Sequence, residues 1–363
     1  MSTSEIDEIR DVARDLLKRR SMRDGRHALL DAGARHDLEL WQEIVALGWT
    51  GIAVPEQHGG VGLPAPALGA VVTELGRALA MTPFASSAGC AVPTILAADN
   101  SAAVESLLPR LAAGELIATV AFDTTDVTVT ASDGDLLISG SAQFVLDADI
   151  ADVLIVAGPD SPVIAVVPLN ERATITPQDG WDPTRSLCSV RLDRAPVARD
   201  GLLAEGTAAQ TLRGTGSAYS ALAMMADAVG TAECALELAV EHAKQRRQFN
   251  RPIGSFQAIK HRLADMVIAL SSSRGAVERG FAALEQGRSV AEAAAVAKSV
   301  AGDACPAICG DAVQVHGGMG FTWEHDAHLH LKRAKLDQVL FGLPRAHRLL
   351  LTRILLDDGC AHA

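Results

Sequence analysis

Residues 246–257 read Arg-Arg-Gln-Phe-Asn-Arg-Pro-Ile-Gly-Ser-Phe-Gln, a polar stretch between two long helical patterns. Arg246 is a candidate phosphate ligand, because a guanidinium presents a planar fork of donors that matches phosphate oxygens. Phe249 can lie against a flat ring, and Gln257 can fix the orientation of a ligand. Each residue also has a plainer interpretation, with Arg246 as a surface or ion-pairing arginine and Phe249 as part of the core.

A second string, residues 314–321, reads Gln-Val-His-Gly-Gly-Met-Gly-Phe. Gly317, Gly318 and Gly320 would let the backbone approach a pyrophosphate and point N–H groups at it. Gln314 can fix the orientation of a ligand. The alternative is that Gly317 and Gly318 form an ordinary helix-ending turn, and we interpret His316 as a structural residue. With residues 246–257, this string favours a dinucleotide site.

The pattern of apolar residues divides the chain into three predicted domains. Residues 1–116 show helical spacing, residues 117–203 contain short segments rich in β-branched residues, and residues 204–363 return to helical spacing. The sequence therefore predicts an α+β fold with a small antiparallel β domain in the middle. Helices are expected over 210–247, 256–286, 290–315 and 322–356, which is typical of an antiparallel bundle. Strands are expected over 117–122, 127–131, 136–139, 153–156, 163–167 and 189–192.

Composition and charge exclude several functions. The net charge of −12 without a basic run argues against nucleic acid as a partner. No apolar run reaches the roughly 18 residues of a membrane span, and the acidic N-terminus does not resemble a signal peptide. The six cysteines are scattered, so we expect reduced thiols in a cytoplasmic protein. Cys305 and Cys309 share a helix face, but no histidine cluster accompanies them, and we predict no metal site.

A third string carries the family resemblance together with the first two. Residues 49–56 read Trp-Thr-Gly-Ile-Ala-Val-Pro-Glu, and residues 74–79 read Glu-Leu-Gly-Arg-Ala-Leu. Over nearly its whole length the chain resembles the acyl-CoA dehydrogenase family. The resemblance implies an N-terminal helical domain, a middle antiparallel β domain and a C-terminal four-helix bundle. It also implies FAD as cofactor, acyl-CoA as substrate and an electron-transfer flavoprotein as acceptor.

In that family the FAD ligands come from the bundle of a neighbouring subunit, across a dimer interface. The resemblance implies this role for six residues of the present chain, namely Arg246, Phe249, Gln257, Gln314, Gly317 and Gly318.

The chain departs from the family where the catalytic base should stand. The common form reads Glu-Gly where this chain has Phe341-Gly342, and a phenyl ring cannot accept a proton. Other members place the base early in the first helix of the bundle, where this chain has Ser220, followed by Ala221 in place of an arginine. The threonine after Glu-Gly is Leu343. We considered Asp227 and Asp337 as substitutes and interpret both as structural, so we assign no catalytic residue.

The predicted β domain also departs from the family pattern. The stretch 121–127 is shortened and lacks the family's glycine, Phe144 stands in the place of a tryptophan, and Leu146 replaces a flavin-binding threonine. Losing these polar contacts weakens a flavin site built from this domain. Glu324 and Asp326 match the family's helix-start pattern and need no catalytic role.

The intact bundle strings and the missing base suggest a shared site. The chain resembles the base-less subunit of the heterotetrameric (α2β2) acyl-CoA dehydrogenases of actinobacterial steroid side-chain catabolism. The hypothesis is that a homologous partner supplies the glutamate and that the substrate is a steroid or branched acyl-CoA. Three alternatives remain open: an active homo-oligomer with an unrecognised base, a non-redox acyl-CoA hydratase or dehydratase, and a structural subunit that binds no cofactor.

Overall fold

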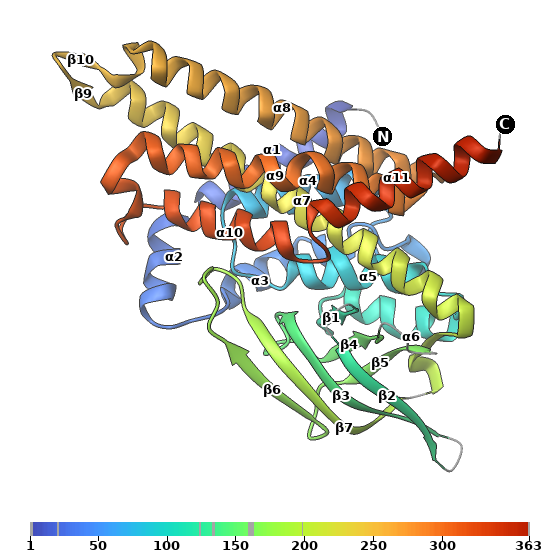
Figure 1. Ribbon diagram of the computed structural model, residues 1–363. Coiled ribbons are helices and arrows are strands. Elements are labelled where there is room, and N and C mark those ends of the chain that lie inside the picture. Colours follow the sequence, from blue (N-terminus) through green and yellow to red (C-terminus); the bar gives the residue numbers. More distant parts are fainter. Residues whose placement is uncertain are drawn as a thin grey trace. The chain divides into compact units, whose positions relative to one another are not determined.

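The computed structural model describes residues 3–19, 22–122, 125–132, 135–158, 163–197 and 199–361 (Figure 1). Its contacts divide the chain into two compact units. Unit 1 comprises residues 1–33, 69–80 and 221–363, and unit 2 comprises residues 34–68 and 81–220. The predicted order of helical, β and helical regions is confirmed.

Unit 1 is helical. The predicted long helices are confirmed as α7 (Gly206–Gln245, in this unit from Ala221), α8 (Gln257–Glu285) and α9 (Val290–His316). Helix α9 packs against α8, α10 (Ala327–Val339) and α11 (Pro344–Ala361). Its buried face is largely alanine, which lets neighbouring helices approach closely. The unit also contains α1 (Thr3–Arg19), α2 (Met22–Asp31) and most of α4 (Ala65–Arg77).

The prediction of a single helix over 322–356 is wrong, because the helix is interrupted between α10 and α11. Phe341 and Gly342 have φ angles of +56° and +97°, outside the range of a right-handed helix. Pro344 opens α11, where its missing N–H group costs no helical hydrogen bond. The apolar periodicity continues through the break, and it hid the stop signal that Gly342 and Pro344 provide.

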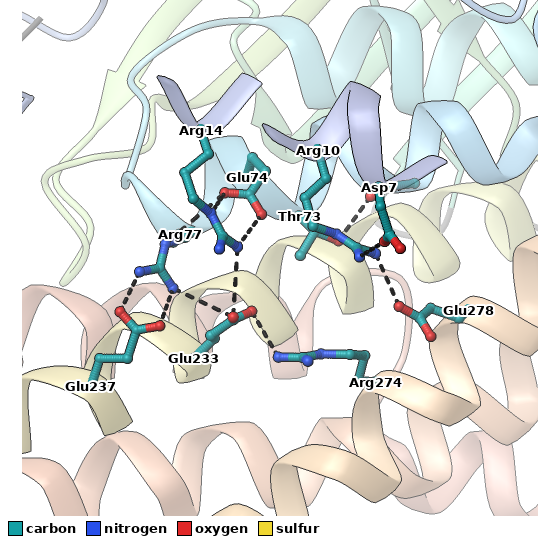
Figure 2. Close-up of polar contacts among 11 residues, drawn as sticks. Asp7, Arg10, Arg14, Thr73, Glu74, Arg77, Glu233, Glu237, Arg274 and Glu278 are labelled. Atoms are coloured by element: carbon teal, nitrogen blue, oxygen red, sulfur yellow. Dashed lines mark hydrogen bonds and ion pairs between the residues drawn. The ribbon is translucent and has the colours of Figure 1, made fainter. Parts of the chain in front are cut away.

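An ion-pair network joins α1, α4, α7 and α8 in unit 1 (Figure 2). Arg14 forms a two-pronged pair with the buried Glu74, with N···O distances of 2.9 and 2.6 Å. Arg77 pairs with Glu237, and Arg274 reaches Glu233 at 2.9 Å. Glu74 and Arg77 belong to the string at 74–79, so its charged residues hold helices together in this chain.

Unit 2 contains short helices and two sheets. Within the helical spacing predicted for residues 1–116, α3 (Leu38–Ala46) and α6 (Ser101–Ala112) begin after the capping residues Asp37 and Asn100. A π-helical turn (Ala85–Ala91) leads into α5 (Val92–Leu96).

One sheet has the strand order β1-β4-β5-β8, and the other has the order β2-β3-β7-β6. The bounds are β1 Ala118–Ala121, β2 Thr125–Ser132, β3 Asp135–Leu146, β4 Val153–Val156, β5 Val163–Pro168, β6 Ala173–Gln178, β7 Leu187–Val197 and β8 Leu202–Glu205. The pairs are antiparallel except β1 with β4, which is parallel. The sequence missed β6 and β8. Half of the β6 residues are exposed and none is buried, so this strand lacks the apolar run that identified the others.

Within the described part of the chain, no helix is long and apolar enough to cross a membrane. The five cysteines whose side chains are described carry free thiols, and four of them are buried. Burial raises the pKa of the Cys305 thiol to about 12, so it stays protonated at neutral pH. The side chain of Cys360 lies outside the described residues.

Candidate flavin and acyl-CoA site

Residues 246–257 form a hairpin between α7 and α8, at one end of the helices of unit 1 (Figure 1). Strands β9 (Arg247–Gln248) and β10 (Arg251–Pro252) pair antiparallel. The two turn residues, Phe249 and Asn250, have φ angles of +50° and +61°, as a type I′ turn requires. In this turn the exposed fraction of Phe249 is 87%, so the interpretation of Phe249 as a core residue is wrong.

Backbone hydrogen bonds hold Arg246 at the base of the hairpin. The Arg246 N–H donates to the carbonyl of His242 at 2.8 Å, and its carbonyl accepts from the N–H of Ile253 at 2.8 Å. Arg251 lies 4.0 Å from the centre of the Phe256 ring, and Phe249 meets that ring edge-on. The Arg246 side chain itself is exposed and forms no ion pair within the described residues. A fixed backbone with a free guanidinium is suited to binding an anion.

The second string ends helix α9. Gly317 has φ +66° and ψ −144°, a conformation that is essentially restricted to glycine. A Cβ atom on Gly317 or Gly318 would meet nothing within 4 Å, so the backbone there is open to a ligand. Gln314 is exposed in the last turn of α9, and Gln257 is exposed at the first position of α8.

Ring contacts bring the two strings together. The rings of His242, near the end of α7, and His316, the last residue of α9, have their centroids 4.5 Å apart. An Arg262–Asp311 ion pair joins α8 to α9 near the same ends. The six predicted FAD ligands are all exposed and come from the adjoining ends of three helices. Their exposure and the open glycine backbone fit a dinucleotide.

Side chains of α9 and α11 hold the backbone around Phe341. The buried Lys298 ammonium donates to the carbonyls of Asp337, Gln338 and Leu340 at 2.8, 3.2 and 2.6 Å. The Nε2–H of His347 donates to the carbonyl of Phe341 at 2.9 Å. These contacts fix the backbone of residues 337–341 and place no carboxylate at position 341.

Lys298 was missed by sequence reasoning because it lies in the alanine-rich stretch of α9. Burial lowers the pKa of its amine to about 7, although the charge of Asp337 acts in the opposite direction. A buried lysine that binds three carbonyls caps the C-terminal end of α10.

The other candidate bases have structural surroundings. Ser220 is buried, and its hydroxyl donates to the carbonyl of Gly216 at 2.8 Å. Asp227 is buried and lies 3.3 Å from the guanidinium of Arg333, which is fully buried. Asp337 is also fully buried. Removing a partner from such a buried pair is costly, which agrees with structural roles.

In the β domain, Phe144 is 56% exposed with φ +57°, at an irregularity between β3 and β7. The Leu146 side chain is buried, and its carbonyl accepts a hydrogen bond from Thr119 at 2.6 Å. Leu146 therefore offers no side-chain contact to a flavin. Asp123 and Thr124, in the shortened stretch, lie outside the described residues.

Comparisons with known proteins match both ends of the chain. Residues 3–115 match the model of the acyl-CoA dehydrogenase N-terminal domain, and residues 215–356 match that of the C-terminal domain. Acyl-CoA dehydrogenase IpdE2 of Mycolicibacterium smegmatis is 32% identical over 93% of this chain and 94% of its own length. IpdE2 of Mycobacterium tuberculosis is 30% identical over 85% of this chain and 84% of its own length.

The chain also resembles a subunit in the crystal structure of the ChsE4-ChsE5 complex from Mycobacterium tuberculosis. The TM-score is 0.88 at 23% identity, covering 98% of each chain, a likeness that shows the fold. The matched domains and relatives show that this chain belongs to the acyl-CoA dehydrogenase family. It is a flavoprotein of the acyl-CoA oxidoreductase class, and FAD is the cofactor.

Proposed function

We propose that this chain is one subunit of a heteromeric acyl-CoA dehydrogenase in which a homologous partner supplies the catalytic glutamate. The observation that carries the proposal is the contrast between position 341 and the bundle end. Phe341 occupies the place of the base on a backbone fixed by Lys298 and His347. Meanwhile Arg246 and Phe249 are exposed and held by a rigid hairpin.

In the proposed complex, this chain binds and orients the cofactor. Arg246 donates to the pyrophosphate, while Gly317 and Gly318 let the backbone approach it. Phe249 packs against a ring of the cofactor, and Gln257 and Gln314 fix its orientation. When bound, FAD supplies the acceptor for the hydride from the β-carbon of the acyl group. The partner's glutamate takes the α-proton, and the product is a trans-2-enoyl-CoA.

Exposure of the ligand residues supports a partner. An isolated chain leaves Phe249 87% exposed, and a second subunit would cover it. The structural relative ChsE4-ChsE5 is itself a complex. A steroid or branched acyl-CoA and an electron-transfer flavoprotein as acceptor belong to the proposal by family resemblance.

Flavin absorbance tests the shared site. The protein is purified alone and then co-expressed with candidate homologous subunits. We expect a colourless single chain and a yellow complex with one FAD per pair. A single chain that carries one FAD and turns over acyl-CoA would overturn the proposal in favour of an active homo-oligomer.

Substitution of Arg246 tests its role as an FAD ligand. In the complex, Arg246→Ala removes charge-assisted hydrogen bonds, and we expect FAD affinity to fall roughly ten- to hundredfold. Arg110→Ala is the matched control, because Arg110 is also exposed but lies on α6 of unit 2. Fluorescence titration of the FAD-free complex measures the FAD affinity of both variants. Equal affinities in the two variants would contradict the assignment.

A further inference from the structure

Three histidine rings form a cluster in unit 1. The ring of His316 contacts those of His242 and His325, with centroid distances of 4.5 and 4.3 Å and interplanar angles of 35° and 57°. Each comes from a different segment: the last turn of α7, the end of α9, and the turn before α10. The Nδ1–H of His316 donates to the carbonyl of Ala312 at 2.7 Å, which fixes the central ring.

The histidine cluster adjoins the residues that we assign to the pyrophosphate. Arg246 lies one helical turn beyond His242, and its N–H donates to the His242 carbonyl. Gly317 directly follows His316 in the chain. His242 is half-buried, so its ring is partly accessible to solvent.

The Arg246 guanidinium opposes protonation of His242 when no anion is present. Burial lowers the pKa of His242, and the nearby His316 and Arg246 lower it further. Among the nearest carboxylates in the sequence, Asp326 pairs with Arg26 and His27 at 2.7 and 2.9 Å. Glu241 pairs with Lys244 at 2.6 Å. His242 is therefore neutral at pH 7 in the free chain.

We propose that His242 takes up a proton from solvent when the diphosphate of FAD binds at Arg246 and Gly317–Gly318. This inference rests on the proposed function, because it assumes that FAD binds there. The two negative charges of the diphosphate exceed the single positive charge of Arg246, so the bound anion favours imidazolium where Arg246 had opposed it. The proton adds to a ring nitrogen of His242, and no covalent bond to the cofactor forms. The contact with the His316 ring holds the His242 ring in place.

Proton uptake makes FAD affinity depend on pH. If the pKa of His242 is higher in the bound than in the free state, affinity falls as pH rises between those two values. With one proton taken up, the FAD affinity changes by at most about tenfold per pH unit.

Isothermal titration calorimetry of the FAD-free complex measures this directly. FAD is titrated near pH 7 in two buffers of different ionisation enthalpy, and the difference gives the number of protons bound. We expect uptake of up to about one proton per FAD in the native complex. Uptake indistinguishable from zero would overturn the proposal without any variant.

His242→Gln separates the histidine from other groups. Glutamine suits the last turn of α7, and we expect the variant to bind FAD with proton uptake near zero and a flatter pH profile. His58→Gln, in the loop of unit 2, is the matched control and should keep the native uptake. Uptake that persists in His242→Gln would overturn the proposal while leaving the proposed function intact. A complex that binds no FAD at any pH would overturn both.

Discussion

Two regions of unit 1 share unusual backbone angles but differ in chemistry. At the bundle end, Phe249, Asn250 and Gly317 have positive φ and present exposed polar or aromatic groups. Between α10 and α11, Phe341 and Gly342 also have positive φ, yet neither side chain can accept a proton. The comparison shows that positive φ angles occur both where exposed ligand candidates gather and where the side chains carry no proton-accepting group. At the helix break, Lys298 and His347 hold the backbone, so its geometry serves the fold.

The largest expected effect concerns Lys298. Lys298→Met keeps a long side chain but leaves the carbonyls at the end of α10 without their donor. We expect the free energy of unfolding to fall by about 2–4 kcal/mol, because buried carbonyls without a partner are costly. Chemical denaturation measures this free energy of unfolding. Lys335→Met, an exposed lysine on α10, should change stability by less than about 0.5 kcal/mol.

The pH dependence of stability provides a second test of Lys298. Its folded pKa of about 7 lies below the value of 10.5 for an unfolded lysine. The unfolded chain therefore binds more protons above pH 7, and this lysine makes stability rise with pH, by up to about 1.4 kcal/mol per unit. Measurements between about pH 7 and 8 stay below the pKa of about 8.5 of unfolded cysteines, most of which are then still protonated. An identical slope in Lys298→Met would contradict the buried-amine assignment.

Sequence periodicity predicted the long helices because the spacing of apolar residues marks the buried face of a single helical segment. It could not predict Lys298, whose partners lie 39–42 residues further along the chain. It also could not reveal the break at residues 340–343, because local apolar spacing continues there. The cue was present in Gly342 and Pro344, but it is weaker than the surrounding pattern.

A smaller effect at the bundle end can separate backbone shape from ligand contact. Gly317→Ala and Gly318→Ala each add a Cβ atom in open space, but only Gly317 has positive φ. We expect Gly317→Ala to lower the free energy of unfolding by about 1–3 kcal/mol and Gly318→Ala to change it little. Both should weaken FAD binding to the complex, because a Cβ would hinder the approach of a phosphate. Unchanged FAD affinity in Gly318→Ala would contradict the assignment of the FAD site to this turn.

The candidate FAD ligands were predicted from local motifs, and the structure shows them at adjoining helix ends. The roles of His242 and His325 were missed because only the fold brings their rings against His316. The ring of Phe249 has an exposed position that depends on a two-residue turn, which the sequence hints at only through Asn250.

The smallest expected effect is the sharpest test of the comparison. In the proposed assignment, Phe341→Glu restores the family's base at a position whose backbone is already held. We nevertheless expect the single chain to show no acyl-CoA-dependent dye reduction, and Phe341→Leu to behave in the same way. The buried Leu146 side chain has no hydrogen-bonding group, and the same proposal assigns Ala221 to the place of a substrate-binding arginine. Turnover by Phe341→Glu alone would show that only the base was missing, and that the bundle end and the helix break differ by one side chain.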